Sequence, residues 1–156
     1  DDYSRGIAVG KCKCLVTMQM LMPGVPCVFY GDEAGAEGYR DPFCRCCYPW
    51  GNEDTELMEF YRKNISLRNE NEVFRSGEFE TVYKINNGYG FIRYDENESY
   101  IVLINSGNSE WFRLDVARYG IFELYGVFHN ENYSSEDGIY YIDMPRYAVK
   151  IFKKVK

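Results

Sequence analysis

Residues 23–33 read PGVPCVFYGDE, and this stretch carries the clearest indication of the fold. Its apolar run, Cys27 to Tyr30, is bounded by Pro and Gly on one side and by Gly31 on the other. Such a run is typical of a short strand that is buried on both faces, as in a parallel sheet. That strand would need neighbours, yet no second strand of this kind precedes residue 77. We therefore expect these residues to be the tail of a larger α/β sheet or barrel whose upstream repeats are absent from the chain.

Helical patterns flank this stretch on both sides. Before it, residues 4–22 are mostly good helix formers, and Pro23 and Gly24 end the pattern. The apolar stripe expected on this helix comprises Ala8, Leu15, Met18, Leu21 and Met22. After it comes a long loop, residues 31–51, which its aromatic and charged residues predict to be ordered. Asn52 or Asp54 can then cap a second helix that ends near Asn71.

Beyond Gly77 the pattern changes from helical to alternating, which predicts strands. The expected strands cover residues 79–85, 89–94, 100–104, 111–116, 121–127, 139–142 and 147–152. Turn signals such as Asn86-Asn87-Gly88 separate them, and about seven short antiparallel strands indicate a sandwich. We thus predict an α+β chain in which residues 1–76 belong to a catalytic barrel and residues 77–156 form a β-sandwich domain.

Charge and cysteine content exclude some classes of function. The 156 residues contain 18 Lys and Arg against 24 Asp and Glu, a formal net charge of −6. This sign disfavours nucleic acid and anionic membranes as partners, and no apolar run approaches the length of a spanning helix. The six cysteines all lie in the first third of the chain, unlike a disulfide framework. We interpret them as reduced thiols and expect a cytoplasmic protein.

Several of these motifs resemble the end of the catalytic barrel in the α-amylase family, close to its neopullulanase and cyclomaltodextrinase branch. Residues 23–33 are similar to the family pattern PGxPCIYYGDE, and residues 41–45, DPFCR, to its DPxCR. Residues 61–68, YRKNISLR, are similar to the helix YRKLIxLR that precedes a β-sandwich in the family. The resemblance covers residues 4–77 in detail and the remainder only by architecture.

The resemblance implies that residues 25–30 are the eighth strand of a (β/α)8 barrel and that residues 31–50 line its sugar cleft. It also implies a retaining glycosidase acting on an α-glucan oligosaccharide or cyclodextrin. In the family the catalytic carboxylates lie on earlier strands, so we expect no catalytic residue in this chain and no activity from it alone. His129 lies in the β-sandwich and cannot replace the family's histidines.

Asp41 and Arg45 match family positions that contact glucose units, so we expect them to bind substrate. A carboxylate accepts hydrogen bonds from sugar hydroxyls and a guanidinium donates to them, while Trp50 or Tyr48 could stack on a pyranose face. The alternative is that Asp41 and Arg45 form an ion pair that only fixes the loop. Trp50 is more often a core residue than a platform.

Other side chains could suggest further sites. Asp32 and Glu33 are paired carboxylates, but the resemblance implies that they order the strand end. Zinc bound by Cys12, Cys14, Cys44 and Cys47 is disfavoured because Cys12 and Cys14 point in different directions on a helix. Residues 133–138 lack the spaced oxygen ligands of a calcium loop. We expect no cofactor and no metal.

A second hypothesis is a non-catalytic carbohydrate-binding sandwich. It would use surface aromatics such as Trp111, Tyr119, Tyr125 and Tyr141. The alternation in residues 111–116 favours Trp111 as the only aromatic surface candidate, and this disfavours the hypothesis. We also expect an exposed apolar patch around residues 25–30, which self-association could cover.

Overall fold

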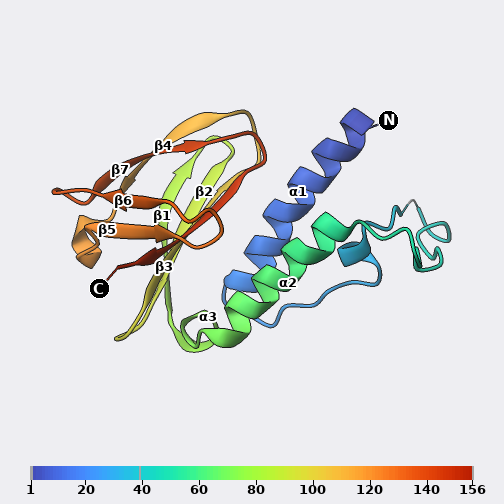
Figure 1. The fold of residues 1–156 in the computed structure, drawn as a ribbon, viewed down its shortest axis with the longest axis horizontal. Coiled ribbons are helices and arrows are strands. Elements are labelled where there is room, and N and C mark those ends of the chain that lie inside the picture. The colour runs from blue at the N-terminus through green and yellow to red at the C-terminus, as the bar shows by residue number, and fades with distance from the viewer. Residues whose placement is uncertain (1, 39, 156) are drawn as a thin grey trace.

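The computed structural model describes residues 2–38 and 40–155 and arranges them in three layers (Figure 1). The first layer contains helices α1 (Asp2–Leu21), α2 (Thr55–Glu70) and α3 (Val73–Ser76), and the 3-10 helix η1 (Asp32–Ala34) precedes α2. A six-stranded antiparallel sheet forms the second layer, and a two-stranded sheet forms the third. The fold therefore combines helices with an antiparallel sandwich, as the sequence predicted.

The strand order in the large sheet is β1-β2-β3-β8-β5-β6, and β4 pairs with β7 in the small sheet. The strands are β1 (Glu78–Ile85), β2 (Gly88–Tyr94), β3 (Ser99–Asn105), β4 (Glu110–Asp115), β5 (Glu123–Gly126), β6 (Asn132–Ser134), β7 (Ile139–Met144) and β8 (Val149–Lys154). The short helix η2 (Ala117–Tyr119) follows β4. Seven of these strands overlap the predicted ranges, whereas β6 was not predicted.

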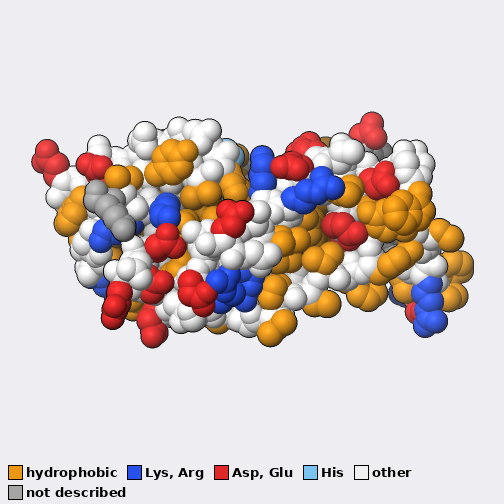
Figure 2. All heavy atoms as spheres, turned by 60° about the horizontal axis from the view of Figure 1, so that its bottom comes forward, with side chains coloured by type: hydrophobic (Ala, Val, Ile, Leu, Met, Phe, Trp, Pro, Cys, Tyr) orange, Lys and Arg blue, Asp and Glu red, His pale blue; other side chains and the backbone are white. Residues whose placement is uncertain are grey.

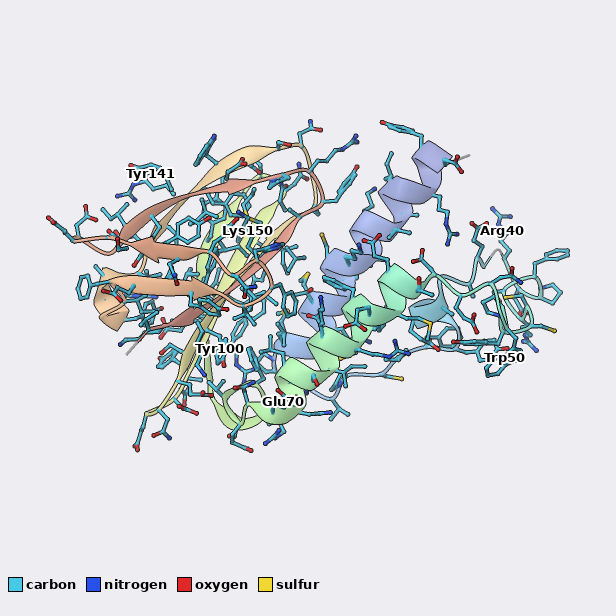
Figure 3. The ribbon with its side chains drawn as sticks, viewed as in Figure 1. Arg40, Trp50, Glu70, Tyr100, Tyr141 and Lys150 are labelled. Carbon is cyan, nitrogen blue, oxygen red and sulfur yellow. The ribbon has the colours of Figure 1, made fainter. Side chains whose placement is uncertain are left out.

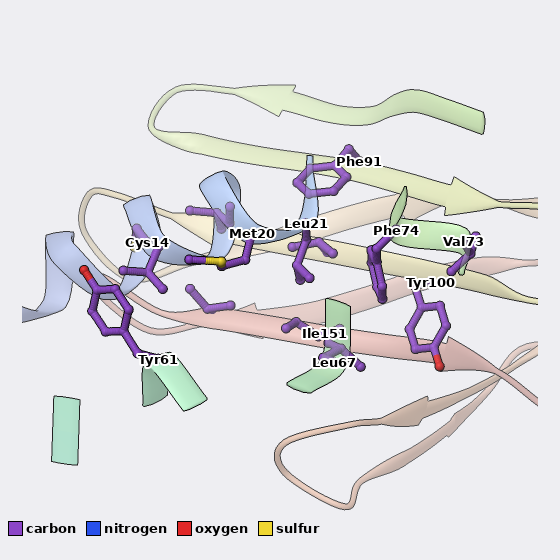
Figure 4. Close-up of a cluster of buried hydrophobic side chains, with 14 of the residues drawn as sticks. Cys14, Met20, Leu21, Tyr61, Leu67, Val73, Phe74, Phe91, Tyr100 and Ile151 are labelled. Carbon is purple, nitrogen blue, oxygen red and sulfur yellow. The ribbon is translucent and has the colours of Figure 1, made fainter. Parts of the chain in front are cut away.

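Strand β3 separates two hydrophobic cores. Because successive side chains point to opposite faces, Tyr100, Val102 and Ile104 belong to the core under the helices. Ile101 and Leu103 belong to the second core, between the two sheets. Figure 4 shows the first core, in which Met20 and Leu21 of α1 meet side chains of the large sheet. A strand buried on both faces thus holds the three layers together.

The buried face of α1 differs from the expected stripe. Leu15 was placed on that stripe, but its side chain is 65% exposed. Leu21 of the expected stripe is buried, together with Cys14, Val16, Thr17 and Met20, which were not on that stripe. The reason is that α1 packs against both α2 and the large sheet. Its buried surface is therefore wider than a single stripe and is centred on different residues.

Residues 25–29 do not form the expected strand within the described chain; their backbone has no regular secondary structure. Val25 is 97% exposed and Phe29 67% exposed, so the predicted apolar patch is present. A strand needs a neighbour to accept and donate its backbone hydrogen bonds, and no strand lies beside this segment among the described residues. The apolar run alone therefore cannot produce the strand.

Two buried arginines tie the end of α1 to the other layers. Arg93 of β2 is 1% exposed, and its guanidinium donates to the carbonyl oxygens of Leu21, Phe74, Gly77 and Glu78 at 2.9–3.2 Å. Arg68 of α2 donates to the carbonyl oxygens of Met20 at 2.6 Å and Gly24 at 2.7 Å. The acceptors Met20 and Leu21 lie in the last turn of α1, where a helix leaves carbonyl groups without intrahelical partners.

Candidate functional site

The loop between η1 and α2 is held at its base by polar contacts. Gly31 and Gly35, at φ 78° and 71°, bracket η1 in the left-handed conformation that glycine favours. The backbone nitrogen of Asp54 donates to the Ala34 oxygen at 3.0 Å. Arg5 of α1 forms ion pairs with Glu37 at 3.0 Å and with Asp54 at 3.2 Å. The two ends of the loop are thus fixed to each other and to α1.

Asp41 and Arg45 lie together in a turn of this loop. The Arg45 Nε donates to the Asp41 Oδ1 at 2.8 Å, and the Arg45 backbone nitrogen donates to the Pro42 oxygen at 3.0 Å. The Asp41 side chain is 64% exposed and the Arg45 side chain 76%. Among the described residues, Asp41 Oδ2 and the two Arg45 Nη atoms have no hydrogen-bond partner. The pair can therefore stabilise the turn and still offer an acceptor and two donors to a ligand.

Aromatic rings lie in the same loop. The rings of Tyr48 and Trp50 are 4.5 Å apart, and the Tyr30 ring is 6.3 Å from Tyr48 at 69°. Trp50 is 79% exposed, so the expectation of a core residue is wrong. Figure 2 shows hydrophobic side chains gathered at the end of the molecule that this loop occupies, and Figure 3 labels Trp50 there. The loop thus carries the exposed Trp50 as well as the exposed polar pair of Asp41 and Arg45.

Asp32 and Glu33 lie in η1, directly after the apolar run. Burial, and secondarily the neighbouring Glu33 carboxylate, raise the pKa of Asp32. The backbone nitrogen of Asp32 donates to the Phe29 oxygen, and its backbone oxygen accepts from Gly35. Asp32 also lines an open groove of about 500 Å³ between α1 and the loop. The backbone contacts of Asp32 help to form the turn after residue 30.

The cysteines considered for zinc face different neighbours. The Cys12 Sγ lies 3.7 Å from the Tyr61 hydroxyl oxygen, whereas Cys14 is buried and its Sγ donates to the Asn105 oxygen at 3.6 Å. Burial raises the pKa of the Cys14 thiol to about 11. Cys44, in the loop, is within 3.8 Å of the Asp41 Oδ1. Each of these three thiols therefore contacts a different group: the Tyr61 hydroxyl, the Asn105 carbonyl or the Asp41 carboxylate.

Tyr141 was named for a carbohydrate-binding sandwich, but the sequence pattern favoured Trp111 alone as the surface aromatic. Tyr141 of β7 is 63% exposed and lies on the same outer face as Trp111 of β4, which is 66% exposed. The expectation that Trp111 is the only aromatic surface candidate is therefore wrong. The pattern in β7 could have indicated this, because Tyr141 alternates with the buried Tyr140 and Ile142. Tyr119 and Tyr125 are instead engaged by Glu80 at 2.9 Å and Asn130 at 2.5 Å.

Comparison with curated proteins finds glycosidases. The chain is 38% identical over 127 residues to an amylopullulanase from Thermoanaerobacter thermohydrosulfuricus, covering 74% of this chain and 9% of that protein. It is 31% identical over 159 residues to an amylopullulanase from Thermoanaerobacterium thermosulfurigenes, covering 92% and 8%. A cyclomaltodextrinase from Thermoanaerobacter pseudethanolicus is 36% identical over 104 residues, covering 65% and 18%. The chain thus spans less than a fifth of the length of these relatives.

Solved structures agree with these relatives. An Anoxybacillus α-amylase has a TM-score of 0.85 at 28% identity, covering 94% of this chain and 32% of its own. A cyclomaltodextrinase structure has a TM-score of 0.83 at 26% identity, covering 92% and 25%. No family model matches the chain. Among the described helices, none has the length and hydropathy that a membrane span requires. The identity to these relatives shows that the chain belongs to the α-amylase family, and its helices and sandwich match the C-terminal part of the solved enzymes.

Proposed function

We propose that this chain is the C-terminal part of a longer retaining glycoside hydrolase that cleaves α-glucans, with the catalytic carboxylates on another part of that enzyme. The observation that carries the proposal is the exposed loop of residues 31–51 in a chain related to amylopullulanases and cyclomaltodextrinases. One solved relative is an α-amylase complexed with acarbose. Residues 1–76 would then belong to the barrel and residues 77–156 to the sandwich domain.

Asp41 and Arg45 would bind glucose units of the substrate in this enzyme. Their exposed, partly unsatisfied polar atoms suit pairs of sugar hydroxyls, and Trp50 lies in the same loop. The ion pair between them does not compete with this role, because it occupies only one oxygen and one nitrogen. It would orient both groups before sugar binds.

The first test compares turnover of cyclodextrin and pullulan by the 156-residue chain and by the longer protein that contains it. We expect activity in the longer protein only. Robust turnover by the short chain, purified free of host amylases, would place catalytic groups within it and refute the proposal. Inactivity of both proteins would refute the assignment as an α-glucan hydrolase.

The second test separates sugar binding by Asp41 and Arg45 from a purely structural ion pair. In the longer enzyme, Arg45→Ala should raise KM for maltooligosaccharides about tenfold, since it removes a charged hydrogen bond. The swapped variant D41R/R45D retains an ion pair but exchanges donor and acceptor, so it should remain impaired. Recovery of activity in the swapped variant would show that the ion pair only stabilises the loop and that neither side chain binds sugar. Arg62→Ala, which removes an exposed ion pair with Glu59 on α2, is the matched control.

We further propose a cytoplasmic enzyme, and for the short chain a tendency to self-associate through the apolar patch of residues 25–30. Support for the location comes from six free cysteines, including the exposed Cys27 and Cys47. A Bacillus subtilis relative, 31% identical over 103 residues, is named an intracellular maltogenic amylase. Fractionation of the native host, followed by detection of the enzyme, tests the location.

A further inference from the structure

The outer face of the small sheet carries an arrangement that the loop site does not use. In the register of β4 and β7, Trp111 is opposite Asp143, Arg113 is opposite Tyr141, and Asp115 is opposite Ile139. Trp111 and Tyr141 are therefore diagonal neighbours, a spacing of roughly 7–8 Å within reach of large aromatic side chains. Both rings are more than 60% exposed.

Polar groups flank these two rings. Arg113 and Asp143 belong to the same cross-strand pairs as Tyr141 and Trp111, and neither side chain forms a hydrogen bond or ion pair with another described residue. The inner side chains of the same strands, Phe112 and Ile142, are fully buried in the second core. The strands from which the outer rings and charges project are thus anchored by a packed core on the opposite face.

We propose that Trp111 and Tyr141 form an α-glucan-binding platform, flanked by Arg113 and Asp143. A pyranose ring presents an apolar face of C–H groups and an edge of hydroxyls. An exposed ring can cover the apolar face, while a guanidinium donates to hydroxyls and a carboxylate accepts from them. The choice of an α-glucan, rather than another sugar polymer, rests on the proposed function.

The composition of this face favours a sugar over other occupants. Asp115 and Asp143 place negative charge beside the rings, on a chain of net charge −6, and this disfavours nucleic acid and other polyanions. A second protein would need a continuous apolar centre, whereas here every aromatic ring is paired across the strands with a charged residue. A chain of sugar units matches this face, because its apolar C–H faces suit the rings and its hydroxyls suit the charged groups between them.

The platform is separate from the loop site. Figure 3 places Trp50 and Arg40 at one end of the molecule and Tyr141 on the sandwich, across the helices. An α-glucan held at Trp111 and Tyr141 would therefore be bound independently of Asp41 and Arg45. The platform would serve long substrates, which could be held on the sandwich while another segment reaches the cleft.

The experiment uses the two tryptophans of the chain, Trp50 and Trp111. In the Trp50→Phe variant, Trp111 is the only tryptophan, so its fluorescence reports the sheet face alone. Titration with maltoheptaose should change this emission saturably, and Tyr141→Ala in the same background should weaken binding about tenfold or more. Phe122→Ala removes a 47% exposed ring outside this face and is the matched control; it should leave the titration unchanged.

Retention of the chain in a starch-containing native gel gives an independent measurement. Trp111→Ala and Tyr141→Ala should each reduce retention, while Phe122→Ala should not, and circular dichroism checks that each variant is folded. An unchanged Trp111 emission with maltoheptaose would overturn the proposal. So would retention that depends on Asp41 and Arg45 but not on Trp111. A dimer that Trp111→Ala dissociates, without any response to maltoheptaose, would instead assign the face to self-association.

Failure of the platform and failure of the proposed function remain distinguishable. Binding is measured on the 156-residue chain, whereas the proposed function is measured as turnover by the longer enzyme. Turnover without Trp111-dependent binding would overturn the platform alone. Trp111-dependent maltoheptaose binding without any turnover would support the platform and refute the hydrolase assignment.

Discussion

Arg93 is a buried cation whose partners are main-chain carbonyls at the junction of the helices and the large sheet. Burial, with a smaller contribution from Arg68, lowers the pKa of this guanidinium, which nevertheless stays protonated because arginine titrates far above neutral pH. Its bonds to the Leu21 and Phe74 carbonyls are buried, and those to Gly77 and Glu78 are partly buried. The side chain therefore acts as a connector between α1, α3 and β1.

Replacement of Arg93 by Met should lower the free energy of unfolding by about 3 kcal/mol, because two buried and two partly buried carbonyls lose this donor together. Urea denaturation followed by circular dichroism measures this change. Arg62→Met, on the exposed side of α2, is the control and should stay within about 0.5 kcal/mol of the parent. A loss of similar size in both variants would show that Arg93 has no special role.

At the scale of the element, α2 begins directly after Asp54, one of the two caps that the sequence predicted. The Asp54 Oδ1 accepts a hydrogen bond from the Leu57 backbone nitrogen at 3.0 Å, and the Oδ2 pairs with Arg5. A carboxylate at this position satisfies an otherwise free N–H and interacts favourably with the helix dipole. The same residue thus starts the helix and closes the base of the loop.

Asp54→Ala should lower the free energy of unfolding by about 1 kcal/mol through loss of this cap. Asp54→Asn retains a capping oxygen and should recover most of that loss. Thermal melts of the three proteins at one pH provide the measurement. Equal destabilisation by Ala and Asn would show that the Arg5 ion pair, rather than the cap, carries the contribution of Asp54.

Glu80 of β1 connects the edge of the large sheet to η2. It accepts hydrogen bonds from the hydroxyls of Tyr94 at 2.7 Å and Tyr119 at 2.9 Å, and from Arg118 at 2.7 Å. The Tyr94 bond, followed by the Tyr119 bond, holds the pKa of Glu80 below its usual 4.5. The unfolded chain therefore binds this proton more tightly than the folded protein.

The contribution of Glu80 to stability should consequently be fully present above about pH 4.5 and be lost as the pH falls through its lower folded pKa. Glu80→Gln lacks this titration, so its Tm should lie below that of the parent at pH 7 and approach it at pH 3. Differential scanning calorimetry across this range tests the prediction. A Tm difference that stays constant with pH would contradict it.

The sequence predicted those elements whose pattern is local. The seven alternating strands and the start of α2 depend on neighbouring residues, and they occur close to their expected positions. The exposure of residues 25–29 was expected, but their irregular backbone was not, since the same apolar run forms a strand only beside suitable partners. Leu15 was misplaced because helix burial depends on which elements pack around it. β6 was missed because a three-residue strand has too few residues to show alternation.

The candidate site was predictable only in part. Similarity of DPFCR to a family motif selected Asp41 and Arg45, and the structure brings them together at 2.8 Å. Whether they touch sugar depends on atoms outside the chain, which no local pattern encodes. Tyr141 was named but set aside, because its proximity to Trp111 follows from the pairing of β4 with β7, which local sequence patterns do not show.

At the scale of the whole molecule, apolar exposure is uneven. Val25, Phe29 and Tyr30 are exposed on one segment, and Trp50 and Phe43 are exposed in the following loop. Monomeric proteins rarely expose contiguous apolar area of this kind. None of these residues belongs to the two hydrophobic cores, which lie under the helices and between the sheets.

The 156-residue chain should therefore bind a hydrophobic dye and self-associate as its concentration rises. The double variant V25S/F29S should reduce both effects while leaving the melting temperature nearly unchanged, because these side chains are exposed. Analytical ultracentrifugation with dye fluorescence provides the measurement. A monodisperse monomer without dye binding would contradict the expectation, and Phe122→Ala serves as a control for loss of an exposed ring elsewhere.

The partners of Arg93 have a consequence for how such enzymes can exchange segments. Every acceptor of this guanidinium is a main-chain oxygen. Any amino acid can supply such an oxygen, provided that the backbone has the same geometry. A sandwich transplanted from one relative to another would therefore find the same acceptors, provided that the receiving helix ends at the equivalent residue. Compatibility in chimaeric proteins should thus depend on helix length at this junction more than on the side chains of α1.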